Sequence, residues 1–241
     1  MSKERKVYTS FHDIPARDYM YFPKGSIELS KPGKFSSIEI RQILISMTVL
    51  TVAFTFALTG NNVITGLSRG FNFSAFPKYL LFSFLGILTG FVFHELSHKF
   101  MAQKQGLWAE YRMFPQGLLL ALILGLFTPF VIAAPGAVVF RGGSRDYETG
   151  RIAMAGPLAN IIVSLVSLCL FIFVFFENGF LGELFGFISI INAFLATFNL
   201  LPFGPLDGVK IIRWNATVWV LLLIVAIFTL LTILPKVPFG I

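Results

Sequence analysis

Two histidines and a glutamate within one apolar stretch have the spacing of a metal-dependent hydrolase. His94, Glu95 and His98 form the pattern His-Glu-x-x-His. Residues four apart lie on one face of a helix, so both imidazoles can reach a single metal ion. Glu95 lies about 100° around the helix from His94, which places it beside the metal, where it can take a proton from a bound water. Charged groups are costly within a membrane helix, so a chance occurrence of this pattern there is strongly disfavoured.

A catalytic zinc needs a third protein ligand and one open position for water. Glu177, Glu183 and Asp207 are the carboxylates at the borders of later apolar runs. The two glutamates flank a short turn and are expected to be solvated. Asp207 follows Pro202 and Pro205, which would unwind a helix end, and irregular backbone at membrane depth is tolerated where it lines a watery cavity. Asp207 is therefore the candidate third ligand, with an ordinary Pro-Leu-Asp-Gly turn as the alternative.

The composition places these residues in an integral membrane protein. Of 241 residues, 56% are hydrophobic and only 13% are charged, with a mean hydropathy of +0.79. Soluble domains carry about 25% charged residues, so a cytosolic enzyme, a disordered chain and a disulfide-stapled secreted domain are excluded. Cys169 is the one cysteine, which excludes an intrachain disulfide and a cysteine-based zinc site. The long apolar runs predict an all-α polytopic membrane protein with about five to six transmembrane helices.

The runs divide the chain into a polar N-terminal arm, residues 1–40, and a membrane domain, residues 41–241. His12 lies in the arm and is assigned to solvent. Spanning helices are predicted at residues 41–59, 79 to beyond 98, 152–176, 184–201 and 216–234. The apolar segment 118–140 is different because it contains Pro129 and Pro135. We expect a re-entrant helix there, followed by a short membrane-associated β-hairpin in which 130–133 and 137–140 flank a Pro-Gly turn.

The placement of Lys and Arg tests this topology. Co-ligation by the His pair and Asp207 requires an even number of crossings between them. With a re-entrant 118–140 segment, 16 Lys and Arg residues fall inside and 3 outside, whereas a full crossing gives 12 and 7. The positive-inside rule favours re-entry, with the N-terminus cytosolic and the His pair and Asp207 near the cytosolic face. No basic stripe with interleaved aromatics occurs, so nucleic acid is not an expected partner.

The chain resembles the site-2 protease family of intramembrane zinc metalloproteases. Three motifs carry the resemblance: His94-Glu95-x-x-His98, Gly156-Pro157-x-x-Asn160, and Asn199-x-x-Pro202-x-x-Pro205-Leu206-Asp207-Gly208. It covers about residues 79–213, the catalytic core of the family. The family often has a second glycine where Val209 stands here, and many members carry a PDZ domain for which this chain has no room. A minimal member of the family is therefore expected.

The resemblance implies one zinc ion per chain, bound by His94, His98 and Asp207, with Glu95 as the general base. It also implies that Asn160 helps to hold the substrate or the developing oxyanion, although a helix-packing hydrogen bond is the alternative. Asn199 likewise could only cap or pack the unwound segment. The expected activity is hydrolysis of peptide bonds in single-span membrane proteins, that is, regulated intramembrane proteolysis within the lipid bilayer.

Two other functions remain open on the sequence alone. A non-catalytic protein that binds or transports metal would use the same ligands without needing Glu95 as a base. Another type of intramembrane zinc protease would take a glutamate as the third ligand in place of Asp207. The segment 130–140 would offer a strand edge to an extended substrate.

Overall fold

The computed structural model describes residues 35–141, 146–175 and 178–236. Five of its helical segments are long and apolar enough to cross a membrane, so the chain is a multi-pass membrane protein. The elements in chain order are α1 (Ser37–Thr59), α2 (Val63–Arg69), α3 (Phe76–Ile87), the π-helical turn η3 (Leu88–Val92), α4 (Phe93–Lys104), β1 (Trp108–Met113), α5 (Pro115–Phe127), β2 (Gly136–Arg141), α6 (Asp146–Phe173), α7 (Gly179–Asn199), α8 (Asp207–Trp214), α9 (Ala216–Ile233) and the short 3₁₀ turn η4 (Leu234–Lys236).

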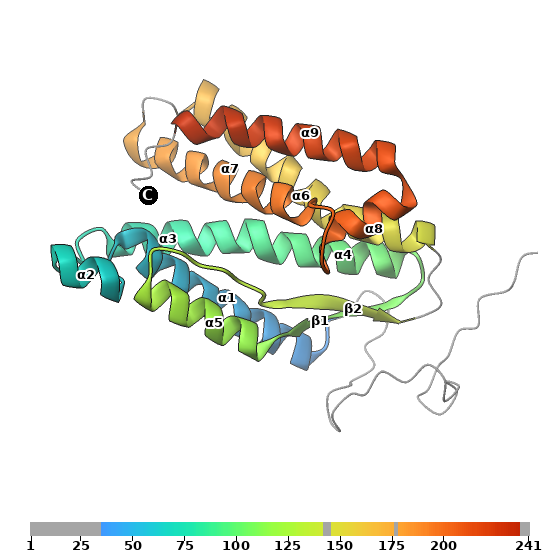
Figure 1. Cartoon of the computed structure of the whole chain (residues 1–241), viewed down its shortest axis with the longest axis horizontal. Helices are drawn as coiled ribbons and strands as arrows, with labels where there is room; N and C mark the ends of the chain where they lie inside the picture. Colours follow the sequence, from blue (N-terminus) through green and yellow to red (C-terminus); the bar gives the residue numbers. More distant parts are fainter. Residues whose placement is uncertain (1–34, 142–145, 176–177, 237–241) are drawn as a thin grey trace, which may run out of the picture.

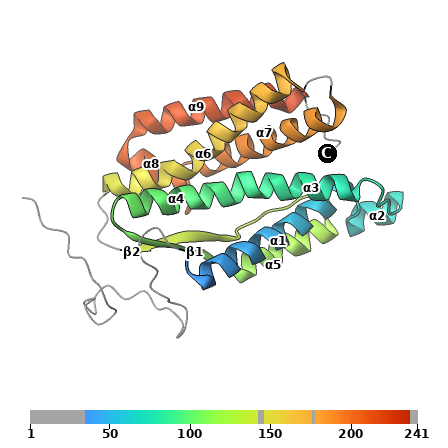
Figure 2. The same ribbon diagram turned by 180° about the vertical axis from the view of Figure 1, so that it is seen from behind.

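The long helices run side by side along the molecule (Figure 1). The continuous rod α3–η3–α4 lies in the middle, with α1 and α5 on one side and α6, α7 and α9 on the other, as the view from behind also shows (Figure 2). The end of α4, the start of α6 and the helix α8 lie at the same end of the bundle (Figure 1). Two crossings, α6 and α7, therefore separate the His-Glu-x-x-His segment from Asp207, which is the even number that co-ligation requires.

The predicted fold class is confirmed, with five candidate spans and one short apolar helix, α5. Helix α1 begins at Ser37, inside the predicted arm, because the Ser36 hydroxyl accepts the Glu39 backbone N–H and caps the helix. Helix α6 begins at Asp146, six residues before the predicted span. Residues 1–34 of the arm, including His12, lie outside the described residues, as do positions 176–177.

The segment 114–135 starts and finishes at the same end of the bundle. Strand β1 ends at Met113, β2 begins at Gly136, and these two residues are antiparallel partners in the two-stranded sheet. Helix α5 has only 13 residues, about 20 Å, which is too short for a hydrocarbon core of about 30 Å. The excursion is thus re-entrant, as predicted.

The predicted pairing within the segment 130–140 is wrong. Residues 130–135 form no strand, and β2 pairs with β1, whose register runs from Trp108↔Arg141 to Met113↔Gly136. Pro135 does not form a tight turn, because Gly136 is already the first paired residue and Phe114 donates its N–H to the Pro135 carbonyl. The strand partner lies before the re-entrant helix, beyond the reach of a local turn signal.

Buried polar contacts attach the sheet to α1 and α4. The Lys99 ammonium on α4 pairs with the Glu39 carboxylate on α1, and both side chains are fully buried. The other Glu39 oxygen accepts the Tyr111 backbone N–H at 2.9 Å. The Tyr111 hydroxyl bonds Ser46 on α1 at 2.9 Å, and burial raises the pKa of this hydroxyl above its ordinary value. These contacts hold β1, and through it β2, beside α4.

Candidate metal centre

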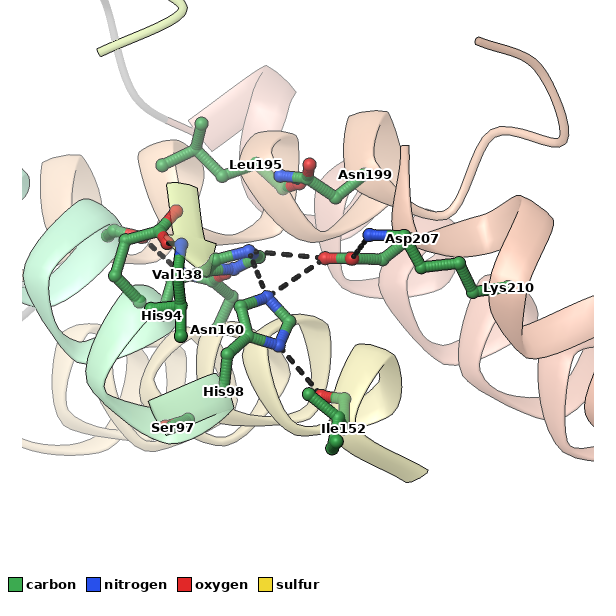
Figure 3. Close-up of polar contacts among 12 residues, drawn as sticks. His94, Ser97, His98, Val138, Ile152, Asn160, Leu195, Asn199, Asp207 and Lys210 are labelled. Atoms are coloured by element: carbon green, nitrogen blue, oxygen red, sulfur yellow. Dashed lines mark hydrogen bonds and ion pairs between the residues drawn. The ribbon is translucent and has the colours of Figure 1, made fainter. Parts of the chain in front are cut away.

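Three potential ligands converge where α4, α6 and α8 meet. His94 and His98 project from successive turns of α4, and Asp207 lies in the first turn of α8. The two Nε2 atoms are 3.0 Å apart, and the Asp207 Oδ2 lies 3.4 Å from His94 Nε2 and 3.0 Å from His98 Nε2. Figure 3 shows both rings turned toward the carboxylate. The prediction that these side chains lie together is borne out by this geometry.

The separations fit a tetrahedral zinc site. With zinc–ligand bonds of about 2.0–2.2 Å, neighbouring ligand atoms of a tetrahedron lie about 3.3–3.6 Å apart. The observed triangle of two nitrogens and one oxygen is close to one face of such a tetrahedron. Two imidazoles and one carboxylate are also ligands that zinc accepts, and they leave a fourth position open. All three residues are less than 10% exposed, so their charges interact at low dielectric.

The second nitrogen of each imidazole is held by a partner away from the triangle. His94 Nδ1 lies 2.5 Å from the Asn160 Oδ1, and His98 Nδ1 lies 2.7 Å from the Ile152 carbonyl oxygen (Figure 3). A carbonyl oxygen can only accept, so His98 carries a proton on Nδ1, and Nε2 is the nitrogen that would bind a metal. Helix α6 therefore orients both ligands, since it supplies both acceptors.

Gly156 allows α6 to approach α4 this closely. A Cβ atom at this position would lie 2.6 Å from His94 Nε2 and 2.6 Å from His98 Cε1. Any side chain here would overlap the ring edges that carry the two Nε2 atoms. The glycine of the Gly-Pro-x-x-Asn motif thus leaves room for the two histidine rings. The asparagine one turn later holds the His94 ring by a hydrogen bond.

Asn160 is fully buried beside His94, and both the oxygen and the nitrogen of its amide group are hydrogen-bonded within the protein. Its Oδ1 contacts His94, and its Nδ2 donates to the Gly90 carbonyl at 2.8 Å and to the Asn192 Oδ1 at 2.9 Å. Contact with a substrate would require one of these bonds to break. The hydrogen bonds of Asn160 join helices, as the packing alternative expected, and they also orient the His94 imidazole.

Asp207 is positioned by the unwound segment that follows α7. Residues 200–206 form turns after α7 ends at Asn199, and the side chain of Asn199 donates to the Leu195 carbonyl one turn back. Gly208 packs directly on this segment, because a Cβ there would overlap the Leu200 carbonyl. The next residue, Val209, does not alter the ligand triangle.

The charge of Asp207 is stabilised although the residue is buried. Burial by itself raises the pKa of this carboxyl, but the charges of His98 and His94 and the hydrogen bonds from both outweigh it, and the pKa lies well below its ordinary value. The Lys210 ammonium donates to Oδ1 at 3.1 Å, which leaves Oδ2 toward the imidazoles. Lys210 was not singled out from the sequence, although its spacing of three residues from Asp207 on a helix is the signal that would find it.

Glu95, the predicted base, is half-buried on α4 next to His94. Its Oε2 accepts the backbone N–H of Val138 on β2 at 3.1 Å. The strand β2 therefore lies against the metal centre, and the edge that is not paired with β1 faces Glu95. This contact was not predictable from the sequence, because it depends on the pairing of β2 with β1.

Within the described residues, His94, His98 and Asp207 form the one group of three potential metal ligands. Glu183 lies on α7 and pairs with Lys78 on α3. Glu177 lies outside the described residues. Asn192, a buried amide in the apolar helix α7, was also missed, and a polar residue within a span is the signal that would have found it.

The fold and the site define a multi-pass membrane protein with a two-histidine, one-aspartate metal centre. The chain is 36% identical over 188 residues to "Putative zinc metalloprotease MJ0611" of Methanocaldococcus jannaschii, covering 77% of this chain and 89% of that protein. It is 33% identical over 154 residues to "Zinc metalloprotease MJ0392" of the same organism, covering 63% of this chain and 38% of that one. It is 29% identical over 148 residues to "Putative zinc metalloprotease YwhC" of Bacillus subtilis, covering 53% and 65%.

The chain therefore belongs to this family of zinc metalloproteases, consistent with a minimal member of the site-2 protease type. The centre formed by His94, His98 and Asp207 fits one zinc ion. No family model matches the chain, and no solved structure matches it.

Proposed function

We propose that the protein is an intramembrane zinc endopeptidase that hydrolyses peptide bonds of single-span membrane proteins, with Glu95 as the general base. The observation that supports this most directly is the ligand triangle formed by two histidines on a candidate spanning helix and an aspartate between two further spans, with a glutamate next in sequence to one histidine. The names of the relatives support the same reaction class.

We assign a separate role in hydrolysis to each group of side chains at the metal centre. A zinc ion held by the three ligands would lower the pKa of a water to about 7 and polarise the scissile carbonyl. Val138 holds Oε2 of Glu95, so the other oxygen is the one that we assign to accept a proton and return it to the leaving amine. Asn160 holds His94 in orientation, which supports a positioning role.

A substrate must be unwound before attack, because a helix hides its peptide bonds in its own hydrogen bonds. The outer edge of β2 suits an extended substrate. In the pair Tyr111↔Val138, both backbone N–H groups point away from the partner strand, one to Glu39 and the other to Glu95. By the alternation of antiparallel ladders, Phe140 also points its N–H and C=O outward.

The edge hypothesis has a direct test at Phe140. Phe140→Pro removes the outward N–H without removing a bond to β1, whereas Phe140→Ala removes the side chain and keeps the N–H. We expect cleavage of a reconstituted single-span substrate to fall strongly in the proline variant and much less in the alanine variant. Equal cleavage by the two variants would contradict substrate binding as an added strand.

The decisive experiment on the activity is Glu95→Gln in purified, reconstituted protein. The substitution keeps size and an oxygen acceptor for Val138 but removes the proton acceptor. We expect zinc content by mass spectrometry to match the wild type, and cleavage of a panel of single-span proteins to be lost, as it is when a chelator removes zinc from the wild type. Cleavage at the original rate in the variant would refute the assigned mechanism, and a wild type that binds zinc but cleaves none of the panel would favour a metal-binding or transport protein.

The orientation is part of the proposal. The distribution of basic residues supports our proposal that the metal-site end of the bundle and the N-terminus face the cytosol. Lys104→Cys, in a background in which Cys169 is replaced by alanine, puts a thiol at the end of α4. In sealed right-side-out vesicles an impermeant thiol reagent should label it only after the membrane is opened.

A further inference from the structure

A chain of buried hydrogen bonds leads from the metal centre into the interior between α3, α6 and α7. It begins at His94 Nδ1 and passes through Asn160 to Asn192, which is fully buried on α7. Asn192 reaches back to Thr89 in the π-helical turn η3, which directly precedes α4. Such turns occur often at functional sites.

The donors and acceptors of Asn192 leave only one orientation for its amide. Its Nδ2 donates to the Ile188 carbonyl at 2.9 Å and to the Thr89 hydroxyl at 3.1 Å. The Thr89 hydroxyl donates its proton to the Leu85 carbonyl, 2.8 Å away, so it must accept the hydrogen bond from Asn192. The Asn192 Oδ1 is consequently the end that faces Asn160.

The orientation of Asn192 fixes that of Asn160. Two oxygens, the Asn192 Oδ1 and the Gly90 carbonyl, face the Asn160 amide at 2.9 and 2.8 Å, and both can only accept. The NH₂ group of Asn160 must point to them, and its Oδ1 must point to His94. A flipped amide would oppose oxygen to oxygen at two places in a medium of low dielectric.

We propose that Asn192 is a positioning residue for metal binding, which acts through Asn160 to keep the proton of His94 on Nδ1 and the lone pair of Nε2 on the metal. The inference rests on the zinc site of the proposed function but not on proteolysis. It gives the π-helical turn a role, because the turn supplies Thr89 and Gly90 as the fixed ends of the network. Partners of metal-bound histidines of this kind change metal affinity by about 10–100-fold when they are removed.

The same two helices offer a matched control. Ser164 on α6 and Ser189 on α7 are fully buried and exchange hydrogen bonds of 2.7 and 3.0 Å with each other's carbonyls. This pair joins α6 to α7 about one turn from the Asn160–Asn192 contact. Removing one of these bonds therefore shows how far zinc affinity changes when α6 and α7 lose an interhelical hydrogen bond that does not lead to a metal ligand.

The experiment compares zinc affinity, by competition with a chromophoric chelator, and the absorption spectrum of the cobalt-substituted protein. We expect Asn192→Leu, which keeps the number and branching of the side-chain heavy atoms but removes the amide, to weaken zinc binding about 10–100-fold and to change the cobalt spectrum, while Ser189→Ala stays close to wild type. Because Asn192 acts through Asn160, the double variant Asn160→Leu/Asn192→Leu should bind zinc no more weakly than Asn160→Leu alone. Wild-type affinity in Asn192→Leu, an equal loss in Ser189→Ala, or additive losses in the double variant would each overturn the inference.

If Asn192→Leu does not fold, Thr89→Val provides the test, because it leaves Asn192 in place and removes the hydroxyl to which Asn192 donates, together with the bond of that hydroxyl to the Leu85 carbonyl. A smaller loss of zinc affinity in the same direction is expected, and an unchanged affinity would overturn the inference. A wild type that binds zinc but cleaves no substrate would refute the proposed function and leave this inference standing.

Discussion

Replacing Gly156 by alanine should abolish metal binding while leaving the fold intact. The added methyl would lie 2.6 Å from both His94 Nε2 and His98 Cε1, whereas ordinary contact begins at 3.4 Å. The His94 ring must therefore retreat by about 0.8 Å, and the His98 ring, whose Nε2 would lie closer still to the methyl, by about 1 Å. Their Nδ1 bonds to Asn160 and Ile152 oppose that movement.

The size of the effect follows from the tolerance of a zinc site. Zinc–ligand distances vary by only about 0.2 Å, so a displacement several times larger breaks the ligand triangle. We expect zinc affinity to fall by at least about 100-fold, or about 2.8 kcal/mol at 1.4 kcal/mol per tenfold. Alanine favours a helix by about 1 kcal/mol over glycine, which offsets the strain in the metal-free protein.

The assay is zinc competition with a chelator, accompanied by thermal unfolding in detergent. Gly86→Ala is the matched control, because its methyl would lie 2.6 Å from a ring atom of Phe187, in the spanning segment Phe76–Lys104 and away from the ligand atoms. That variant should lose stability and keep its zinc affinity. A folded Gly156→Ala protein that binds zinc within about threefold of wild type would refute the assignment of this space to the metal.

Two further predictions concern the aspartate ligand and the buried ion pair. Zinc at 100 times its dissociation constant should stabilise the wild type by about 2.7 kcal/mol, seen as a higher unfolding temperature, and Asp207→Ala should lose that shift; a retained shift would point to a different third ligand. Lys99→Met leaves the Glu39 carboxylate buried without its ammonium partner and should cost about 3–5 kcal/mol of unfolding free energy. The double variant Glu39→Gln/Lys99→Met should recover most of this loss in the same unfolding assay, and no recovery would mean that the two side chains are not coupled.

Much of the helical architecture was predictable because its signals are local. Apolar runs of about 20 residues mark spanning helices, and the five spans lie close to their predicted positions. The re-entrant segment was predictable because prolines disfavour a clean crossing and the basic residues favour re-entry. The hairpin within 130–140 was wrong because strand pairing is not local, and β1 contributes the partner from before α5.

The sequence by itself determined the chemistry of the site. Histidines four residues apart on a helix must share a face, and an aspartate after two prolines must stand beside unwound backbone, whatever the rest of the chain does. Type and spacing were enough to name His94, His98 and Asp207 as ligand candidates and Glu95 as the candidate base.

Only the tertiary structure decided how those groups are held. The Asn160 contact to His94, the Asn192 contact behind it and the approach of Val138 to Glu95 join residues 32 to 66 positions apart in the chain. A hydrogen bond depends on distance and direction in space, and the packing of α4 against α6, α7 and β2 sets both. The sequence thus named the ligands, and the packing of the helices determined which nitrogen and which oxygen of each faces the metal.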